Sequence, residues 1–292
     1  MHDRERRVIA HVTENDIIDG LRALGLDGSS PVLVHASLSS FGQVEGGAAS
    51  VCRALAMVCG TVVMPAGSWD LTGLPMAPPG LERPHNAYST APSWDEFDAA
   101  LAAATPFRDD LPIDRELGVI PETMRRHLEP LRSAHPLFAF IARGACARQV
   151  LDAQRLDWPL GPIEALADLD GDVLLLGVTH TANTTIHLAE QRLGRSRFWR
   201  YAKAAEGVWM ELPNIPGESD AFDDIEPELA DCREVRIGDC RACRVAVRDV
   251  LATATRLIRS DPAALLGNDP DPTSRTAAAL RQRLATLDGE AE

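Results

Sequence analysis

Two residues of this sequence, His187 and Glu190, are the side chains best suited to acid–base chemistry. On a helix, residues three apart are neighbours, so the carboxylate can hold the histidine ring. A histidine that titrates near neutrality can take a proton from a substrate, and a carboxylate beside it stabilises the charged ring. The same spacing is typical of a surface ion pair. The surroundings of the pair must therefore decide what it does.

The elements predicted around the pair place it just after a buried strand. Residues 173–178 form an apolar run with the length of a strand buried on both faces. A helix follows, with Asn183 as its N-cap and Gly194 as the left-handed residue after its last turn. The apolar side chains of one stripe are predicted to face the core: Ile186, Ala189 and Leu193. His187 and Glu190 lie off this stripe, which is how an enzyme would mount a general base.

Hydroxyl groups at the start of this helix could stabilise the negative oxygen that develops when an acyl group is attacked. Thr184, Thr185 or the free backbone N–H groups of the first turn are the candidates. A metal-dependent hydrolase, with His180, His187 and Glu190 as ligands, is an alternative. A protein that binds acyl-CoA or a drug without catalysis is another.

Length and charge restrict the class of protein. A chain of 292 residues can form one large domain or two small ones. The net charge of −14 argues against a nucleic-acid partner and suits either solubility or a polycationic substrate. The first ten residues do not resemble a signal peptide, and no run of about 18 apolar residues is present. We therefore expect a cytoplasmic protein without a membrane span.

The six cysteines fit this location. Cys52, Cys59 and Cys146 lie in apolar surroundings and are interpreted as small core residues. Cys240 and Cys243 form a CxxC pattern with Cys232 upstream, but no second ligand pair follows at the spacing of a zinc site. We expect neither a metal nor a cysteine nucleophile.

Several further segments have clear signals. The strand 31–34 leads through the serine-rich HASLSSFG to Gly46, Gly47 and a helix over 48–57, where exposed N–H groups could hold a phosphate. Residues 68–98 contain many prolines and no sustained period, which predicts an ordered loop that lines a cleft. Strands are predicted at 61–64 and 234–237, and helices at 13–25, 121–127, 146–153 and 244–260. Residues 158–172 are interpreted as a connection, and 267–292 as a polar tail.

Five segments in a fixed order together resemble the aminoglycoside 3-N-acetyltransferase family, the antibiotic N-acetyltransferases unrelated to the GNAT fold. They are VHASLSSFGQVEGGA, GTVVMPAGS, LGVIPETMRR, RSAHPLFAFIARG and LLLGVTHTANTTIHLAE. The resemblance covers most of the chain, from about Thr13 to Ser260. One departure is local, because the family usually has a Ser-Pro pair where Pro162 is followed here by Ile163.

The resemblance implies an α/β fold, a three-layer α/β/α arrangement around a mixed sheet with an irregular inserted loop region lining the substrate cleft. It implies one domain over 1–266, and acetyl-CoA as the donor that acylates an amine of an aminoglycoside. His187 becomes the general base, Glu190 its partner and Thr184 the oxyanion group. The segments that line the coenzyme A channel in the family correspond to these residues: His35, Ser37, Leu38, Ser39, Val44, Ser133, His135 and Pro136.

The acceptor side is predicted from charge. An aminoglycoside carries several ammonium groups, so acids are the expected contacts. The candidates are Asp70, Asp223, Asp224 and Glu226. Each of them alone is more typical of a solvated surface, and His35 and His135 could equally be capping or core histidines. The acceptor could also be a different amine.

Overall fold

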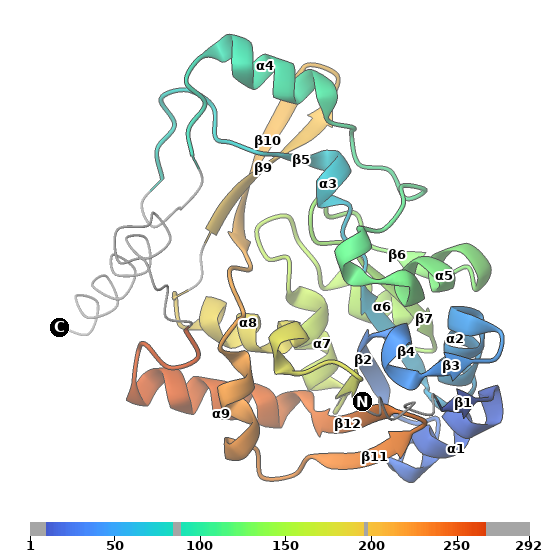
Figure 1. The fold of residues 1–292 in the computed structure, drawn as a ribbon. Coiled ribbons are helices and arrows are strands. Elements are labelled where there is room, and N and C mark those ends of the chain that lie inside the picture. Colours follow the sequence, from blue (N-terminus) through green and yellow to red (C-terminus); the bar gives the residue numbers. More distant parts are fainter. Residues whose placement is uncertain (1–9, 84–88, 196–197, 267–292) are drawn as a thin grey trace, which may run out of the picture.

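A seven-stranded mixed sheet forms the centre of the protein (Figure 1). The computed structural model describes residues 10–83, 89–195 and 198–266. The strand order is β11-β12-β8-β2-β4-β7-β6, and the three central strands β8, β2 and β4 run parallel. The strands span these residues: β2 Pro31–Ala36, β4 Thr61–Pro65, β6 Leu131–Arg132, β7 Phe140–Gly144, β8 Asp172–Leu176, β11 Arg233–Ile237 and β12 Cys240–Ala246. All five residues of β8 are buried, as the apolar run predicts.

Helices pack on both faces of this sheet, because alternate side chains of each strand point to opposite sides. Val34 and Leu174 belong to one apolar cluster, which includes residues of α1 (Glu14–Ala23), α2 (Gly47–Val58) and α5 (Val119–His127). Leu33 and Val173 belong to the other. That cluster includes residues of α6 (Ala147–Asp152), α7 (Gly161–Asp168), α8 (Thr184–Arg192) and α9 (Val247–Ser260). The predicted α/β fold with a mixed sheet is confirmed.

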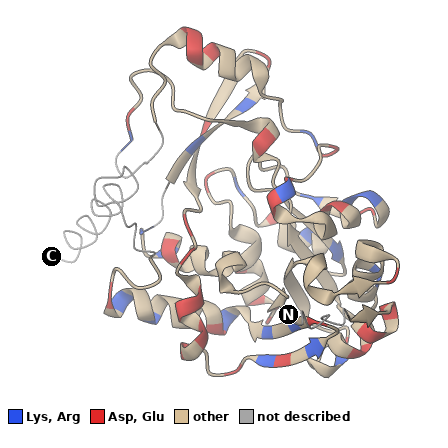
Figure 2. Ribbon diagram, in the orientation of Figure 1, with Lys and Arg blue, Asp and Glu red and all other residues tan. Residues whose placement is uncertain are grey.

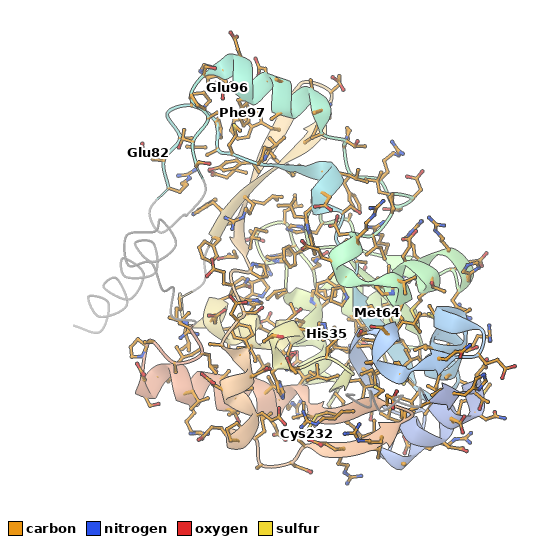
Figure 3. The ribbon with its side chains drawn as sticks, viewed as in Figure 1. His35, Met64, Glu82, Glu96, Phe97 and Cys232 are labelled. Atoms are coloured by element: carbon orange, nitrogen blue, oxygen red, sulfur yellow. A yellow bond between two sulfur atoms is a disulfide. The ribbon has the colours of Figure 1, made fainter. Side chains whose placement is uncertain are left out.

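A smaller lobe rises from the main body at the top of Figure 1. Its three-stranded sheet has the order β10-β9-β5, from β5 (Gly73–Leu74), β9 (Phe198–Ala205) and β10 (Val208–Ile215). Helix α4 (Trp94–Ala103) covers this sheet, and Figure 3 shows Phe97 on this helix. The Phe97 ring meets the Trp209 ring edge to face, with centroids 5.6 Å apart. Residues 68–98, expected to be an irregular loop, thus contain three regular elements: α3 (Trp69–Thr72), β5 and the start of α4.

Two predictions of secondary structure are wrong. Residues 161–168, interpreted as a connection, form helix α7, which has Pro162 in its first turn where a missing N–H costs nothing. The predicted helix over 244–260 begins three residues later, because Arg244 to Ala246 belong to β12 and pair with β8. At the start of the predicted helix 244–260, pairing with a neighbouring strand thus outweighs the local helix preference.

The cysteines differ from expectation at one place. Cys232 and Cys243 form a disulfide, which the CxxC pattern does not indicate, and Figure 3 shows Cys232 beside the start of β11. Cys52, Cys59 and Cys240 are free and buried, and Cys146 is free and partly buried. Within the described ranges, the helices are too short or too polar to cross a membrane. The predicted tail 267–292 lies outside the described residues.

Candidate active site

The candidate active site lies where the parallel strands β2 and β8 end at one edge of the sheet. Such an edge is where open α/β sheets place their ligands. The two loops that leave it touch, since the Ser37 N–H donates to the Leu176 carbonyl at 3.0 Å. Gly177 has φ +71°, and a Cβ there would lie 1.6 Å from the Ser40 Oγ. Only glycine fits this crossing of the loops.

Helix α8 begins at this end of the sheet, as the sequence predicts. The Asn183 side chain accepts the Thr185 N–H at 3.1 Å, which confirms the N-cap. The same side chain contacts the His180 Nδ1 at 3.1 Å. The prediction of a single buried stripe is too narrow, because residues 185–191 are all buried. Helices α7 and α9 both contact α8, so a side chain off the stripe is not at the surface.

The predicted pair, His187 and Glu190, is therefore buried and not a surface ion pair. The Nδ1 of His187 lies 2.8 Å from the Glu190 Oε2. The Phe222 ring packs against the His187 ring, with centroids 4.7 Å apart. Glu190 is only 1% exposed. An ionised carboxylate accepts the Nδ1–H, so the neutral ring keeps its lone pair on Nε2, where a base needs it.

A third charged residue, Arg195, completes this cluster, and the sequence reasoning missed it. Its Nη2 and Nε donate to the Glu190 Oε1 at 2.8 and 3.2 Å. Burial alone would raise the pKa of Glu190, but the hydrogen bond from His187 and the charges of His187 and Arg195 outweigh it and lower that pKa. The carboxylate is therefore ionised. The available signal was Gly194, which predicts a turn back toward the helix.

The threonines and the other histidines near the start of α8 have fewer contacts than the His187–Glu190–Arg195 cluster. Thr184 is partly exposed at the first helical position, and the buried Thr185 Oγ1 has no hydrogen-bond partner among the described residues. Burial, together with the charge of His180, lowers the pKa of His35 to about 3. In the described part of the chain, no three His, Cys, Asp or Glu side chains come together as a metal site requires. His180, His187 and Glu190 thus do not form the ligand set of the hydrolase alternative.

A cavity of about 580 Å³ adjoins the loop after β2. Four residues predicted to bind the coenzyme line it: Ser37, Leu38, Ser39 and Val44. The start of α2 at Gly47, the turn before α5 and Val178 complete the wall. Hydroxyl groups, glycine backbone and apolar side chains fit an arm that is partly amide and partly hydrocarbon, such as the pantetheine of acetyl-CoA. His35 lies on β2, two residues before Ser37 and near the centre of the molecule (Figure 3).

The other predicted coenzyme residues do not reach this cavity. Ser133 and His135 line a separate cavity of about 470 Å³ beside α6, and the Pro136 carbonyl accepts the Thr72 hydroxyl at 2.7 Å. The Nδ1 of His135 accepts the N–H groups of Leu137 and Phe138 at 3.2 and 3.0 Å. This is the capping role that the sequence left open. Burial lowers the pKa of His135 to about 4.

The four predicted acceptor acids fall into two groups. Asp223, Asp224 and Glu226 lie on the 3-10 helix η4 (Phe222–Glu228), which carries the Phe222 that packs on His187. Asp223 accepts the Thr181 N–H at 3.1 Å, Asp224 is exposed, and Glu226 forms an ion pair with Arg241. Figure 2 shows the acids spread over many elements and not gathered in one stretch.

Asp70 is the remaining acid, at the start of α3. It lines a cavity of about 600 Å³ between α3, α4 and the β9–β10 hairpin. Asp114, another residue the sequence reasoning missed, caps this short helix by accepting the N–H groups of Trp69 and Asp70. Burial raises the pKa of Asp114 to about 6, although these two hydrogen bonds oppose the shift. The cavity wall is largely apolar and also includes Arg200.

The carboxyl end of the sheet thus carries a buried His187–Glu190 pair, and a cavity with hydroxyl groups and apolar side chains adjoins the loop after β2. The model of the aminoglycoside 3-N-acetyltransferase family matches residues 33–259, and this chain belongs to that family. The resemblance read from the five segments is confirmed. The protein is therefore an N-acetyltransferase of this family, and acetyl-CoA is its acetyl donor.

Individual relatives agree with this assignment. The chain is 32% identical over 225 residues to the SPbeta prophage-derived aminoglycoside N(3')-acetyltransferase-like protein YokD of Bacillus subtilis (strain 168), covering 73% of this chain and 79% of YokD. It is 37% identical over 181 residues to aminoglycoside N(3)-acetyltransferase IV of Salmonella sp, covering 60% of this chain. The matched part spans 57% of that Salmonella enzyme.

Solved structures share the fold along nearly the whole chain. The apoenzyme of aminoglycoside acetyltransferase AAC(3)-IVa superposes with a TM-score of 0.74 at 28% identity, over 94% of this chain and 99% of that one. A mutant of the same enzyme in complex with a gentamicin gives 0.74 at 27% identity, over 95% and 100%. The fold of the relatives thus extends beyond the aligned stretch of sequence.

Proposed function

We propose that this protein transfers the acetyl group of acetyl-CoA to the 3-amino group of an aminoglycoside, and so confers resistance, with His187 as the general base. The observation that carries the proposal is the buried contact of 2.8 Å between the His187 Nδ1 and the Glu190 Oε2. An ammonium group cannot attack a thioester, so one proton must leave first. With its Nδ1–H donated to Glu190, His187 offers Nε2 to take that proton.

The remaining groups are assigned to binding. Ser37, Leu38, Ser39 and Val44 hold the coenzyme arm in the cavity they line, while Thr184 and the first N–H groups of α8 stabilise the oxyanion. His35 supports the coenzyme loop from β2. The names of the relatives and the gentamicin complex of a structural neighbour support an aminoglycoside as the acceptor.

For the acceptor, the acids are assigned to the ammonium groups. Asp70 contributes from the small lobe, and Asp223 and Asp224 contribute from η4 beside the base. Glu226 is the least available of them, because Arg241 engages its carboxylate. The cavity at Asp70 also contains Arg200, which favours an acceptor with fewer charges at that end. A different amine is therefore the second candidate for the substrate.

The test is release of free coenzyme A thiol from acetyl-CoA, measured with a panel of aminoglycosides and with simple mono- and diamines. We expect turnover with at least one aminoglycoside. His187→Ala should lower kcat by about two to four orders of magnitude, the usual contribution of a positioned base. The control is His127→Ala, which removes an exposed histidine at the end of α5. Near-full turnover of His187→Ala would contradict the role of the base, and turnover with simple amines only would contradict the acceptor.

A further inference from the structure

Arg195 is one of the largest side chains in the protein that are fully buried. The end of helix α8 directs it inward. Gly194 has φ +79°, its N–H donates to the Gln191 carbonyl at 3.1 Å, and the Arg195 N–H donates to the Glu190 carbonyl at 2.9 Å. These two bonds form a Schellman motif, which reverses the chain at the helix end. The backbone of Arg195 is thereby tied to the residue whose side chain it also binds.

The guanidinium group of Arg195 is divided between two partners. Its Nε and Nη2 take one oxygen of the Glu190 carboxylate, and the other oxygen is left for His187. Its Nη1 donates to the carbonyls of Pro262 and Ala264, at 2.9 and 2.5 Å, in the turns that follow α9. The planar group is thus fixed from both sides and cannot rotate away from the carboxylate.

We propose that Arg195 is a positioning residue for the general base, because it fixes the second oxygen of Glu190 and offsets its charge. This inference rests on the proposed function of His187. Glu190 is only 1% exposed, so its negative charge is poorly solvated. Without a neighbouring cation, the His187–Glu190 pair would keep a shared proton up to a higher pH than it does beside Arg195. A base that retains its proton cannot accept another. Arg195 therefore lets Glu190 orient the ring without holding it in the charged form.

The charges around the cluster determine the direction of the effect. The His187–Glu190 pair of α8 faces the cation of Arg195. The carboxylate of Asp261, just after α9, interacts electrostatically with Arg195. Removing the Arg195 cation makes these surroundings more negative. The acidic limb of the kcat/KM profile should then move to higher pH. Neutralising Glu190 instead should move that limb to lower pH, so the two substitutions have opposite signs.

The experiment measures kcat/KM by thiol release between pH 5.5 and 9.5 for Arg195→Met, Arg195→Lys and Glu190→Gln, with melting temperatures. We expect Arg195→Met to move the acidic limb up by about one pH unit, and Arg195→Lys to restore most of the wild-type profile. An equal loss at every pH with an unchanged acidic limb would overturn the proposal and leave Arg195 a purely structural residue.

A double variant keeps the test decisive if Arg195→Met does not fold. In Glu190→Gln/Arg195→Met the carboxylate that pairs with His187 is absent, so the acidic limb should match that of Glu190→Gln alone. A further upward shift in the double variant would show that Arg195 acts without Glu190, against the proposal. His187→Ala, assayed beside these variants, separates the two claims: if it keeps its turnover, the assignment of the base fails, whatever Arg195 does.

Discussion

Two buried histidines from two equally clear sequence motifs take opposite roles in this protein. At the start of α8, the Nδ1 of His187 meets a carboxylate, so this nitrogen carries the proton and Nε2 is free to act as a base. In the turn before β7, the Nδ1 of His135 meets two backbone N–H groups, so it must be the acceptor and Nε2 carries the proton. The residue and its burial are the same, but the proton is on the other nitrogen.

The comparison teaches that the partner of Nδ1 decides what a buried histidine can do. His187 has a negative partner, which would stabilise the charged form of the ring if it acts as the proposed base. The partners of the His135 Nδ1 are both donors, so a second proton on this nitrogen would break the turn that holds the ring. The α8 region is therefore suited to proton transfer, and the turn that contains His135 is suited to support.

With both histidines left in place, the largest effect should come from removing the negative partner of His187. Glu190→Gln should lower kcat/KM by about 10- to 100-fold, less than the loss at His187, because the ring stays but loses its orientation. The acidic limb of the pH profile should also move to lower pH, since the charged ring is no longer stabilised. The measurement is thiol release with acetyl-CoA across pH.

Glu164→Gln is the matched control. Its carboxylate accepts the Trp158 Nε1–H at 2.9 Å and forms an ion pair with Arg192 of α8 at 3.0 Å. The variant therefore makes the same Glu-to-Gln change at a carboxylate that also contacts α8 but not His187. It should leave the acidic limb in place. If both variants give the same profile, Glu190 is only another structural contact of α8.

A smaller effect is expected on stability at the second histidine. The pKa of His135 is lowered to about 4 by burial, so the folded protein resists a proton that the unfolded chain accepts near pH 6.5. This contribution to stability is complete above pH 6.5 and is lost as the pH falls from there toward 4. The free energy of unfolding should then fall by up to about 1.4 kcal/mol per pH unit from this group.

His135→Gln isolates this contribution. The variant should be less stable at pH 7.5 because the turn is weakened, but its stability should depend less on pH between 4 and 6.5. His35, whose pKa is lowered to about 3, remains in both proteins and cancels in the difference. Denaturant unfolding at several pH values makes the measurement. Parallel curves for the two proteins would mean that His135 is not held in its neutral form.

The sequence predicted the α8 region well because its geometry is local. The apolar strand, the Asn183 cap, Gly194 and the HxxE spacing lie within about twenty residues, and each has its own physical signal. Arg195 belongs to the same stretch and could have been found from Gly194. The disulfide, β12 and the division of the predicted coenzyme residues between two cavities depend on contacts between distant segments. No local pattern carries that information.

Substitutions of the predicted acceptor acids should have the smallest effect on activity. They test whether the substrate site at α8 extends to η4. Asp223 and Asp224 lie on η4, whose Phe222 packs on the ring of His187, so they are near the base whereas Asp70 belongs to the small lobe. Asp223→Asn/Asp224→Asn should raise the aminoglycoside KM by about three- to tenfold at low salt and leave the acetyl-CoA KM nearly unchanged. The Asp223 carboxylate accepts the Thr181 N–H, and an asparagine oxygen can accept it too, so the change removes charge without removing that contact.

The control for this double substitution is Asp19→Asn/Asp249→Asn, which removes the same two charges from exposed positions on α1 and α9. Both double variants are measured at two salt concentrations. If η4 receives the ammonium groups, added salt should raise the aminoglycoside KM of the wild type and of the control, and should have less effect when Asp223 and Asp224 are neutral. Equal values for both variants at both salt concentrations would mean that the net charge of −14 serves solubility. The acceptor would then be held by the cavity at Asp70, whose wall is largely apolar and carries Arg200 as well.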